Sequence, residues 1–271
     1  MHILSLKKIE VIPFKTGLVA EGEDVVKLIL SVIKKGRYKL RDGDVIAIAD
    51  KILASSQGRM IDYSRIKLST EATFFSEKYG LEPGFVQVVL NESEKIYGGV
   101  PRAILSLHDG IIIANAGVDH KNAPEGKAAV WPKNPDIIAN KIRMEIEEIV
   151  NKKIGIIIVD SRVDPMRKGT VGIAIGSSGI MPVIDCRGKD DLYGKKLKIT
   201  FINVIDDLAS MAHLAMGETT EKVPIVLIRN SPVIMSSSAT SEEAKISEEE
   251  CLFMRSLKEY FCSDYAEKTE K

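Results

Sequence analysis

The sequence lacks the marks of secreted, membrane-spanning and nucleic-acid-binding proteins. Its three cysteines form no Cys-x-x-Cys pair and their number is odd, which argues against a secreted disulfide framework. Lys and Arg total 38, as do Asp and Glu, so no excess charge favours nucleic acid or an anionic membrane. The first 14 residues hold no signal-like apolar run, and no apolar stretch approaches the about 20 residues that cross a bilayer. We expect a cytoplasmic protein without nucleic-acid or membrane partners.

Several familiar catalytic motifs are also missing. The histidines at 108, 120 and 213 have neither HxxxH nor HExxH spacing, and no serine lies in a GxSxG motif, so zinc and serine-hydrolase chemistry have no support. The glycines at 172, 176 and 179 match neither a Walker A loop nor a dinucleotide-binding GxGxxG. With basic residues 162, 167 and 168 just before them, they can hold phosphate through exposed amides, or they mark a β-bulge or tight hairpin.

The chain has 271 residues, of which 45% are apolar, enough for one large core or two modest ones. Helical periodicity appears at residues 24–34, 70–79, 135–152 and 205–216. Short β-branched runs bounded by turn residues predict strands at 9–13, 45–49, 111–114, 154–159, 172–175, 197–204 and 225–228. Helices and strands do not alternate regularly, and several strand pairs are linked too tightly for crossover helices. An α+β fold with mixed sheets is therefore expected.

The domain organisation follows from one change in composition. Residues 231–241 lose periodicity and become rich in small polar residues, which is typical of a linker. We predict a main domain over residues 1–230, a linker over 231–246, and a C-terminal helix and tail over 247–271. Ser247 and Glu250 have the spacing of a capping box for that helix.

Three acidic residues stand directly after apolar segments. Asp119 follows residues 110–118, Asp160 ends the run 154–159, and Glu218 follows the expected helix 205–216. Carboxylates from separate segments suit a hard cation such as Mg²⁺ or Mn²⁺, which prefers oxygen ligands and often shares them with phosphate. Alternatively, each carboxylate only caps a turn, since spacing alone does not show that they meet.

A series of motifs runs in order along residues 11–229. They are Gly43-Asp44-Val45, Gly58-Arg59, residues 85–94 (FVQVVLNESE), Asn115-Ala116-Gly117-Val118-Asp119 with Asn122, Gly172 to Gly179, residues 190–194 (DDLYG), Asp206-Asp207-Leu208-Ala209 and Met216-Gly217-Glu218. Together they resemble the coenzyme F420-0:L-glutamate ligase family.

The resemblance implies a mixed α/β homodimer that uses GTP and Mg²⁺ or Mn²⁺. Such enzymes add L-glutamate through a γ-linkage to the lactyl-phosphate side chain of coenzyme F420-0, by way of an acyl-phosphate. It also implies metal ligands at Asp119, Asp160, Ser161 and Glu218. The nucleotide-contacting positions would be Thr16, Gly17, Leu18, Val19, Asp50, Lys51, Ser55, Asn122, Met216, Gly217, Thr219, Thr220, Glu221, Lys222 and Val223.

Some positions depart from the family pattern. Ser55 stands where a nucleotide-contacting lysine is usual, and Asp50 and Lys51 replace a common Ser/Thr pair, so Lys51 is a candidate for the missing charge. Lys121 replaces a serine, and a Gly-Arg pair after Asp160 has become Val-Asp at residues 163–164. Two alternatives to the F420-0 ligase therefore stay open: a paralogue that acts on another acidic acceptor, and a non-catalytic dimer that binds metal or nucleotide.

Overall fold

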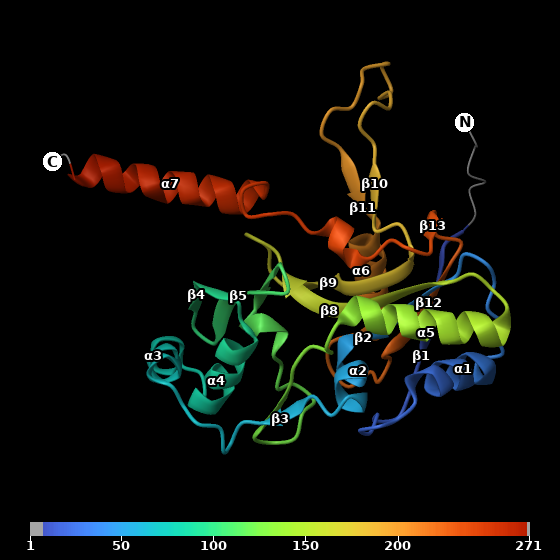
Figure 1. Cartoon of the computed structure of the whole chain (residues 1–271), viewed down its shortest axis with the longest axis horizontal. Coiled ribbons are helices and arrows are strands. Elements are labelled where there is room, and N and C mark those ends of the chain that lie inside the picture. Colours follow the sequence, from blue (N-terminus) through green and yellow to red (C-terminus); the bar gives the residue numbers. More distant parts are fainter. Residues whose placement is uncertain (1–7, 270–271) are drawn as a thin grey trace.

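A computed structural model describes residues 8–269 of the chain, with side chains through residue 260. Its main sheet has six strands in the order β1-β12-β2-β8-β9-β13 (Figure 1). Only β2 and β8 pair in parallel, and the other neighbours are antiparallel. These strands are β1 (Glu10–Phe14), β2 (Val45–Ala49), β8 (Gly155–Val163), β9 (Thr170–Ile180), β12 (Ile225–Arg229) and β13 (Met235–Ser236).

Helices cover both faces of this sheet. One apolar core joins it to α1 (Val25–Lys35), α2 (Asp50–Ser56) and α5 (Pro135–Val150), and a second joins it to α6 (Val204–Met216). The helix ends follow local chemistry, because Asp24 caps α1 by accepting from the Lys27 amide at 3.0 Å, and Pro135 opens α5. Since β2 and β8 are buried on both faces, their sequences are continuous apolar runs.

A smaller unit with its own core lies beside the sheet. It comprises β3 (Met60–Asp62), α3 (Thr70–Tyr79), α4 (Pro83–Glu92), β4 (Lys95–Val100), β5 (Ala103–His108), β6 (Ile111–Ala114), the short 3₁₀ turn η1 (Asn115–Gly117) and β7 (Lys127–Ala129). Strands β4, β5 and β6 form an antiparallel sheet and β3 pairs with β7. This arrangement confirms the α+β prediction, although β3, β4, β5, β7 and α4 were not among the expected elements.

Four strand ends meet at one edge of the main sheet. In the parallel pair, Ala49 lies opposite Val159, so the next residues, Asp50 and Asp160, are neighbours at the carboxyl ends of β2 and β8. The register of β12 places Ile225 opposite Phe14, the last residue of β1, and opposite Ile48, the last but one of β2. The segment before β12 and the loop after β1 therefore reach the same edge.

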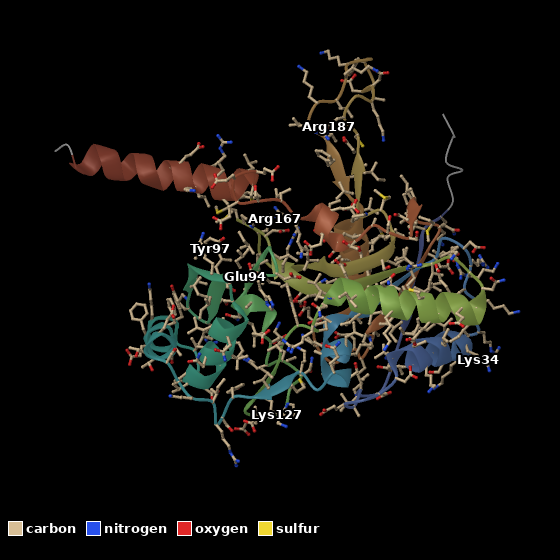
Figure 2. All side chains as sticks on the ribbon, viewed as in Figure 1. Lys34, Glu94, Tyr97, Lys127, Arg167 and Arg187 are labelled. Carbon is tan, nitrogen blue, oxygen red and sulfur yellow. The ribbon has the colours of Figure 1, made fainter. Side chains whose placement is uncertain are left out.

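A two-stranded hairpin stands clear of the main sheet (Figure 1). It pairs β10 (Val183–Asp185) with β11 (Phe201–Asn203). The expected strand at 197–204 is correct only for its second half, because residues 197–200 lie in the loop and Val204 begins α6. Arg187 lies at this hairpin (Figure 2) and pairs with Asp185.

The segment expected as a linker is packed against the main sheet rather than free. Strand β13 pairs with β9, and Ala239 and Ser241 are buried. Ser241 donates through its hydroxyl to Asp136 of α5 at 3.0 Å, and its amide binds the same carboxylate. The small polar residues of this segment form hydrogen bonds with the surface of the main domain. Composition alone does not distinguish such a packed segment from a flexible linker. The end of the main domain near residue 230 stays a prediction.

The C-terminal segment carries the expected capping contacts. The amide of Glu250 donates to the Ser247 hydroxyl, which in turn binds the Glu250 carboxylate, and α7 (Leu252–Thr269) begins shortly after. Glu248 anchors this segment on the smaller unit through Lys95 and Tyr97. Helix α7 then extends away from the body (Figure 1). Within residues 8–269, none of the helices combines the length and apolar character of a membrane span.

Candidate functional site

A cavity of about 720 Å³ opens at the edge where the four strand ends meet. Its walls come from the loop after β1, the first turn of α2, the loop 121–124, the end of β8 and the segment between α6 and β12. Its size is in the range of small-molecule and cofactor sites. Every position expected to contact nucleotide lines this cavity: Thr16, Gly17, Leu18, Val19, Asp50, Lys51, Ser55, Asn122, Met216, Gly217, Thr219, Thr220, Glu221, Lys222 and Val223.

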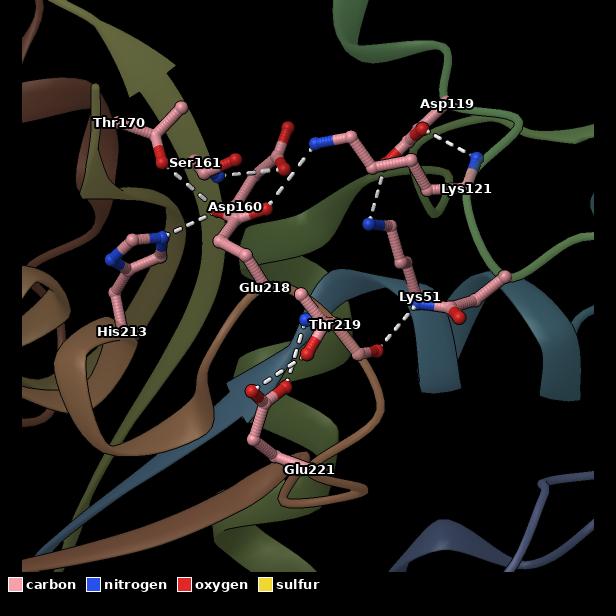
Figure 3. Close-up of polar contacts among 11 residues, drawn as sticks. Lys51, Asp119, Lys121, Asp160, Ser161, Thr170, His213, Glu218, Thr219 and Glu221 are labelled. Atoms are coloured by element: carbon pink, nitrogen blue, oxygen red, sulfur yellow. Dashed lines mark hydrogen bonds and ion pairs between the residues drawn. The ribbon is translucent and has the colours of Figure 1, made fainter. Parts of the chain in front are cut away.

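The four expected cation ligands also belong to this region (Figure 3). Asp160, Ser161 and Glu218 line the cavity, and Asp119 lies behind Lys51, whose ammonium is 2.6 Å from its carboxylate. The loop carrying Asp119 is held by backbone bonds, since the Asp119 amide donates to the Ala129 carbonyl at 3.0 Å and the Asp119 carbonyl accepts from the Ala129 amide at 2.8 Å. Asp119 also accepts from the Lys121 amide, so it caps its own turn. The structure thus brings the separate acidic segments together.

Asp50 and Asp160 are unusual because their surroundings disfavour the charged form. Burial raises the pKa of Asp50 well above its usual range, and the neighbouring Asp160 raises it further. Burial also raises the pKa of Asp160, against hydrogen bonds from the Trp131 indole and the Ser161 amide, each at 2.7 Å. Burial lowers the pKa of Lys51, but Asp50 and Asp119 outweigh this effect and raise it overall. A charged Lys51 therefore offsets part of the negative charge at the sheet edge.

Glu218 has a different environment on the opposite wall. His213 Nε2 donates to Glu218 Oε1 at 2.6 Å, and the Thr170 hydroxyl donates to the same oxygen at 3.1 Å. The other oxygen lies 3.4 Å from the Lys121 ammonium. Burial opposes ionisation, but the His213 hydrogen bond and the Lys121 charge lower the pKa of Glu218 to about 2. Glu218 is consequently a carboxylate held in its ionised form.

The donor set suits a hard divalent cation in kind, because it offers carboxylate and hydroxyl oxygens from three segments. In their present positions, however, no three His, Cys, Asp or Glu side chains among the described residues form a group that could hold an ion. Lys51 and Lys121 instead pair with Asp119 and Glu218. Asp160 and Glu218 line the cavity and Asp119 lies behind Lys51, so the carboxylates form no ready coordination sphere. Their role as ligands stays a prediction.

The basic and glycine-rich segment does not supply a phosphate loop. Arg162 pairs with Asp164 and Asp206, and Arg167 and Lys168 are exposed outside the cavity lining. The glycines of β9 serve packing: a Cβ at Gly172 would lie 2.2 Å from the Ala209 carbonyl oxygen of α6, and one at Gly176 would lie 2.7 Å from Pro135 of α5. Close approach of these helices to a strand explains the spacing.

Sequence reasoning missed two contributors to the site. His213 was considered only for metal spacing, yet it is the nearest donor to Glu218. Trp131 was not considered, although it binds Asp160. The sequence could have indicated the contact of His213 with Glu218, because His213 lies in the last turn of the expected helix and five residues before Glu218. The contact of Trp131 with Asp160 is set by packing, and the spacing of the two residues in the sequence does not predict it.

Comparisons with known proteins show the family of the chain. The family model for F420-0:gamma-glutamyl ligase matches residues 13–230. The chain belongs to the F420-0:gamma-glutamyl ligase family. This match confirms the resemblance that the motifs predicted.

Relatives in this family cover nearly the whole chain. A coenzyme F420:L-glutamate ligase of Methanococcus maripaludis is 40% identical over 244 residues, which is 90% of this chain and 96% of the relative. That of Methanocaldococcus jannaschii is 41% identical over 84% of this chain and 90% of its own length. That of Archaeoglobus fulgidus is 35% identical over 93% of this chain and 98% of its own length.

Proposed function

We propose that this member of the F420-0:gamma-glutamyl ligase family is a GTP- and divalent-cation-dependent ligase that joins L-glutamate to coenzyme F420-0 by an amide bond. The observation that carries the proposal is the meeting of several segments at one edge of the main sheet. It brings the loop after β1, the start of α2, the end of β8 and the segment 216–223 into one cavity, together with the acidic residues. Relatives named coenzyme F420:L-glutamate ligase match almost the entire chain.

Amide formation from a carboxylate needs activation, because a carboxylate is a poor electrophile. In the proposed reaction, an oxygen of the acceptor carboxylate attacks the γ-phosphorus of GTP, and the bond to the leaving GDP breaks. The glutamate amine then attacks the acyl carbon, phosphate leaves with the bonding electrons, and the nitrogen loses a proton. Such a route requires no covalent enzyme nucleophile. Phosphoryl transfer of this kind depends mainly on positioning and electrostatics.

Different residues of the site would bind the cation, hold the loops in place and contact the phosphate. Asp119, Asp160, Ser161 and Glu218 would hold Mg²⁺ or Mn²⁺, which when bound neutralises charge on phosphate oxygens. Asn122 has a left-handed backbone and donates to the Thr219 carbonyl at 3.1 Å, joining the loop 119–122 to the segment before β12 across the cavity. Lys51, on the first turn of α2, is a cation of the cavity wall that can face a bound phosphate.

Omission of single substrates tests the ligase proposal. With purified protein, GTP and Mn²⁺, we expect release of GDP and phosphate only when both coenzyme F420-0 and L-glutamate are present, with equal amounts of amide product. Release of phosphate without glutamate and without any product would show a nucleotidase instead. If other acidic acceptors, but not coenzyme F420-0, support release, the protein is a paralogue with a different acceptor.

One observation favours a non-catalytic alternative. Ser55 faces the cavity where a lysine is expected, and Lys51 already pairs with Asp119. A dimer that binds cation or nucleotide without turnover would bind GTP in a titration but release no GDP in any substrate mixture. The omission experiment therefore separates this alternative from both ligases.

We also propose that the protein is a homodimer, as the family resemblance implies. Two exposed apolar regions support this: Leu192 and Tyr193 on the β10–β11 hairpin are 100% and 89% exposed, and α7 exposes Leu252 and Leu257. Large apolar patches that face solvent commonly mark protein interfaces. The hairpin and α7 both project from the body (Figure 1), where a second copy can reach them.

A further inference from the structure

Trp131 is the only tryptophan of the chain, and it lies at the back of the acidic site. The residue is 2% exposed and lies two positions after the end of β7. Its indole Nε1 donates to Asp160 Oδ2 at 2.7 Å, while the other oxygen of Asp160 accepts from the Ser161 amide. Each carboxylate oxygen thus has one fixed donor and keeps lone pairs for a further partner on the cavity side.

The same indole also contacts the loop that carries Asp119. A Cβ built at Gly117 would lie 2.1 Å from Trp131 Nε1, so the ring edge rests directly on the Gly117 backbone. Gly117 has a φ of +70° and stands two residues before Asp119. Two residues before Trp131, Ala129 forms the reciprocal backbone bonds with Asp119. Trp131 therefore touches Asp160 of the main sheet and the Asp119 loop of the smaller unit at once.

The ring itself has little freedom. His108 stacks on it with centroids 4.7 Å apart and an interplanar angle of 22°. His108 is fixed in turn by a 2.7 Å hydrogen bond between its Nδ1 and the Ala116 carbonyl. Near the backbone of Trp131, the Arg59 guanidinium donates to its carbonyl oxygen and to Glu92. A donor locked in this way fixes the orientation of its acceptor.

We propose that Trp131 is a positioning residue for the cation site, which sets the orientation of Asp160 and its placement relative to Asp119. The inference rests on the proposed cation site. Donors behind a metal ligand orient it, and their loss commonly weakens metal binding by about 10–100-fold. Asp160 lines the cavity whereas Trp131, which donates to it, does not, as is expected of a donor behind a metal ligand.

Titration with Mn²⁺ alone tests this role, with free Mn²⁺ measured by electron paramagnetic resonance. Trp131→Phe keeps an aromatic ring and removes the N–H, so we expect Mn²⁺ to bind about 10–100-fold more weakly at unchanged stoichiometry. His108→Phe is the matched control, because it keeps a ring against the indole and leaves the N–H in place. It should bind Mn²⁺ within twofold of the wild type.

Indole fluorescence gives an independent readout in the unmodified chain, because all tryptophan emission comes from residue 131. Paramagnetic Mn²⁺ bound beside Asp160 should quench it along the same isotherm as the resonance titration, and Mg²⁺ should reverse the quenching by competition. The proposal is overturned if Trp131→Phe binds Mn²⁺ like the wild type, or if His108→Phe weakens binding equally. Should Trp131→Phe not fold, Mn²⁺ binding to the wild type without quenching would overturn it. If the wild type binds no Mn²⁺, the proposed cation site fails as well.

Discussion

Replacing Lys51 by alanine should weaken binding of GTP in the presence of Mn²⁺ by about two- to thirtyfold. Lys51 and Ser55 both lie on α2 and both line the cavity. Because residues four apart share one face of a helix, the ammonium of Lys51 lies one turn from the position where the family usually has lysine. It can therefore supply the phosphate contact that Ser55 lacks.

The magnitude follows from two opposing contributions. A charge-assisted contact with phosphate is worth about 1.5–3 kcal/mol. Turning towards phosphate weakens the pair with Asp119, in which the Lys51 and Asp119 side chains are 34% and 27% exposed, and a pair of that exposure contributes at most about 1 kcal/mol. Even when the full 1 kcal/mol is lost, about 0.5–2 kcal/mol remains, which corresponds to about two- to thirtyfold in affinity.

Calorimetric titration of GTP with Mn²⁺ into four proteins measures this effect. They are the wild type, Lys51→Ala, Ser55→Lys and the double variant, in which the new lysine should restore most of the lost affinity. Lys127→Ala is the matched control, because Lys127 lines the same cavity beside β3 (Figure 2) and should change binding less than twofold. If GTP binds the wild type tightly and Lys51→Ala equally well, the charge compensation is refuted and the nucleotide lies elsewhere.

Three further predictions concern stability and assembly. Asp44→Ala leaves the buried Arg229, 2.7 Å away, without its partner and should lower the free energy of unfolding, measured in urea, by about 3–5 kcal/mol. Asp185→Ala breaks an exposed pair of the same 2.7 Å length and should lower it by under about 1 kcal/mol. Equal losses would contradict the burial argument. Burial opposes ionisation of Glu147, but hydrogen bonds from Lys153 and the Ile154 amide lower its pKa below 4.5. The stability advantage over Glu147→Gln should therefore be full at pH 7 and decline as the pH falls below 4.5; a constant difference would refute it. Light scattering should return twice the chain mass of 29.8 kDa, and a mass near 29.8 kDa would exclude the dimer.

The central sheet could be predicted because strands that are buried on both faces have continuous apolar sequences. The apolar runs at 45–49 and 154–159 are both strands, and they form the parallel pair that places Asp50 beside Asp160. Strands β4 and β5 of the smaller unit were not predicted, because they are partly exposed and mix apolar with polar residues and glycine. Helix α4 was missed since its buried segment is apolar on nearly all sides and lacks helical periodicity.

The sequence predicted which residues form the candidate site but not how their side chains are arranged. Motifs in order along the chain indicated which positions belong together, and the structure places them around one cavity. Spacing could not show that lysines would pair with the carboxylates, nor that Trp131 would reach Asp160, 29 residues away. Such contacts depend on rotamers and on the packing of two units, which a single sequence does not encode in any local pattern.

A crystal grown with a non-hydrolysable GTP analogue and soaked in Mn²⁺ tests most directly whether this sheet edge is a cation and nucleotide site. We expect anomalous density for Mn²⁺ within about 2.0–2.6 Å of oxygens from Asp119, Asp160 and Glu218, with the phosphates of the analogue against the same ion and the loops 16–19 and 216–223 around the nucleotide. Mn²⁺ bound away from all three carboxylates, or a nucleotide bound outside this cavity, would contradict the proposed function.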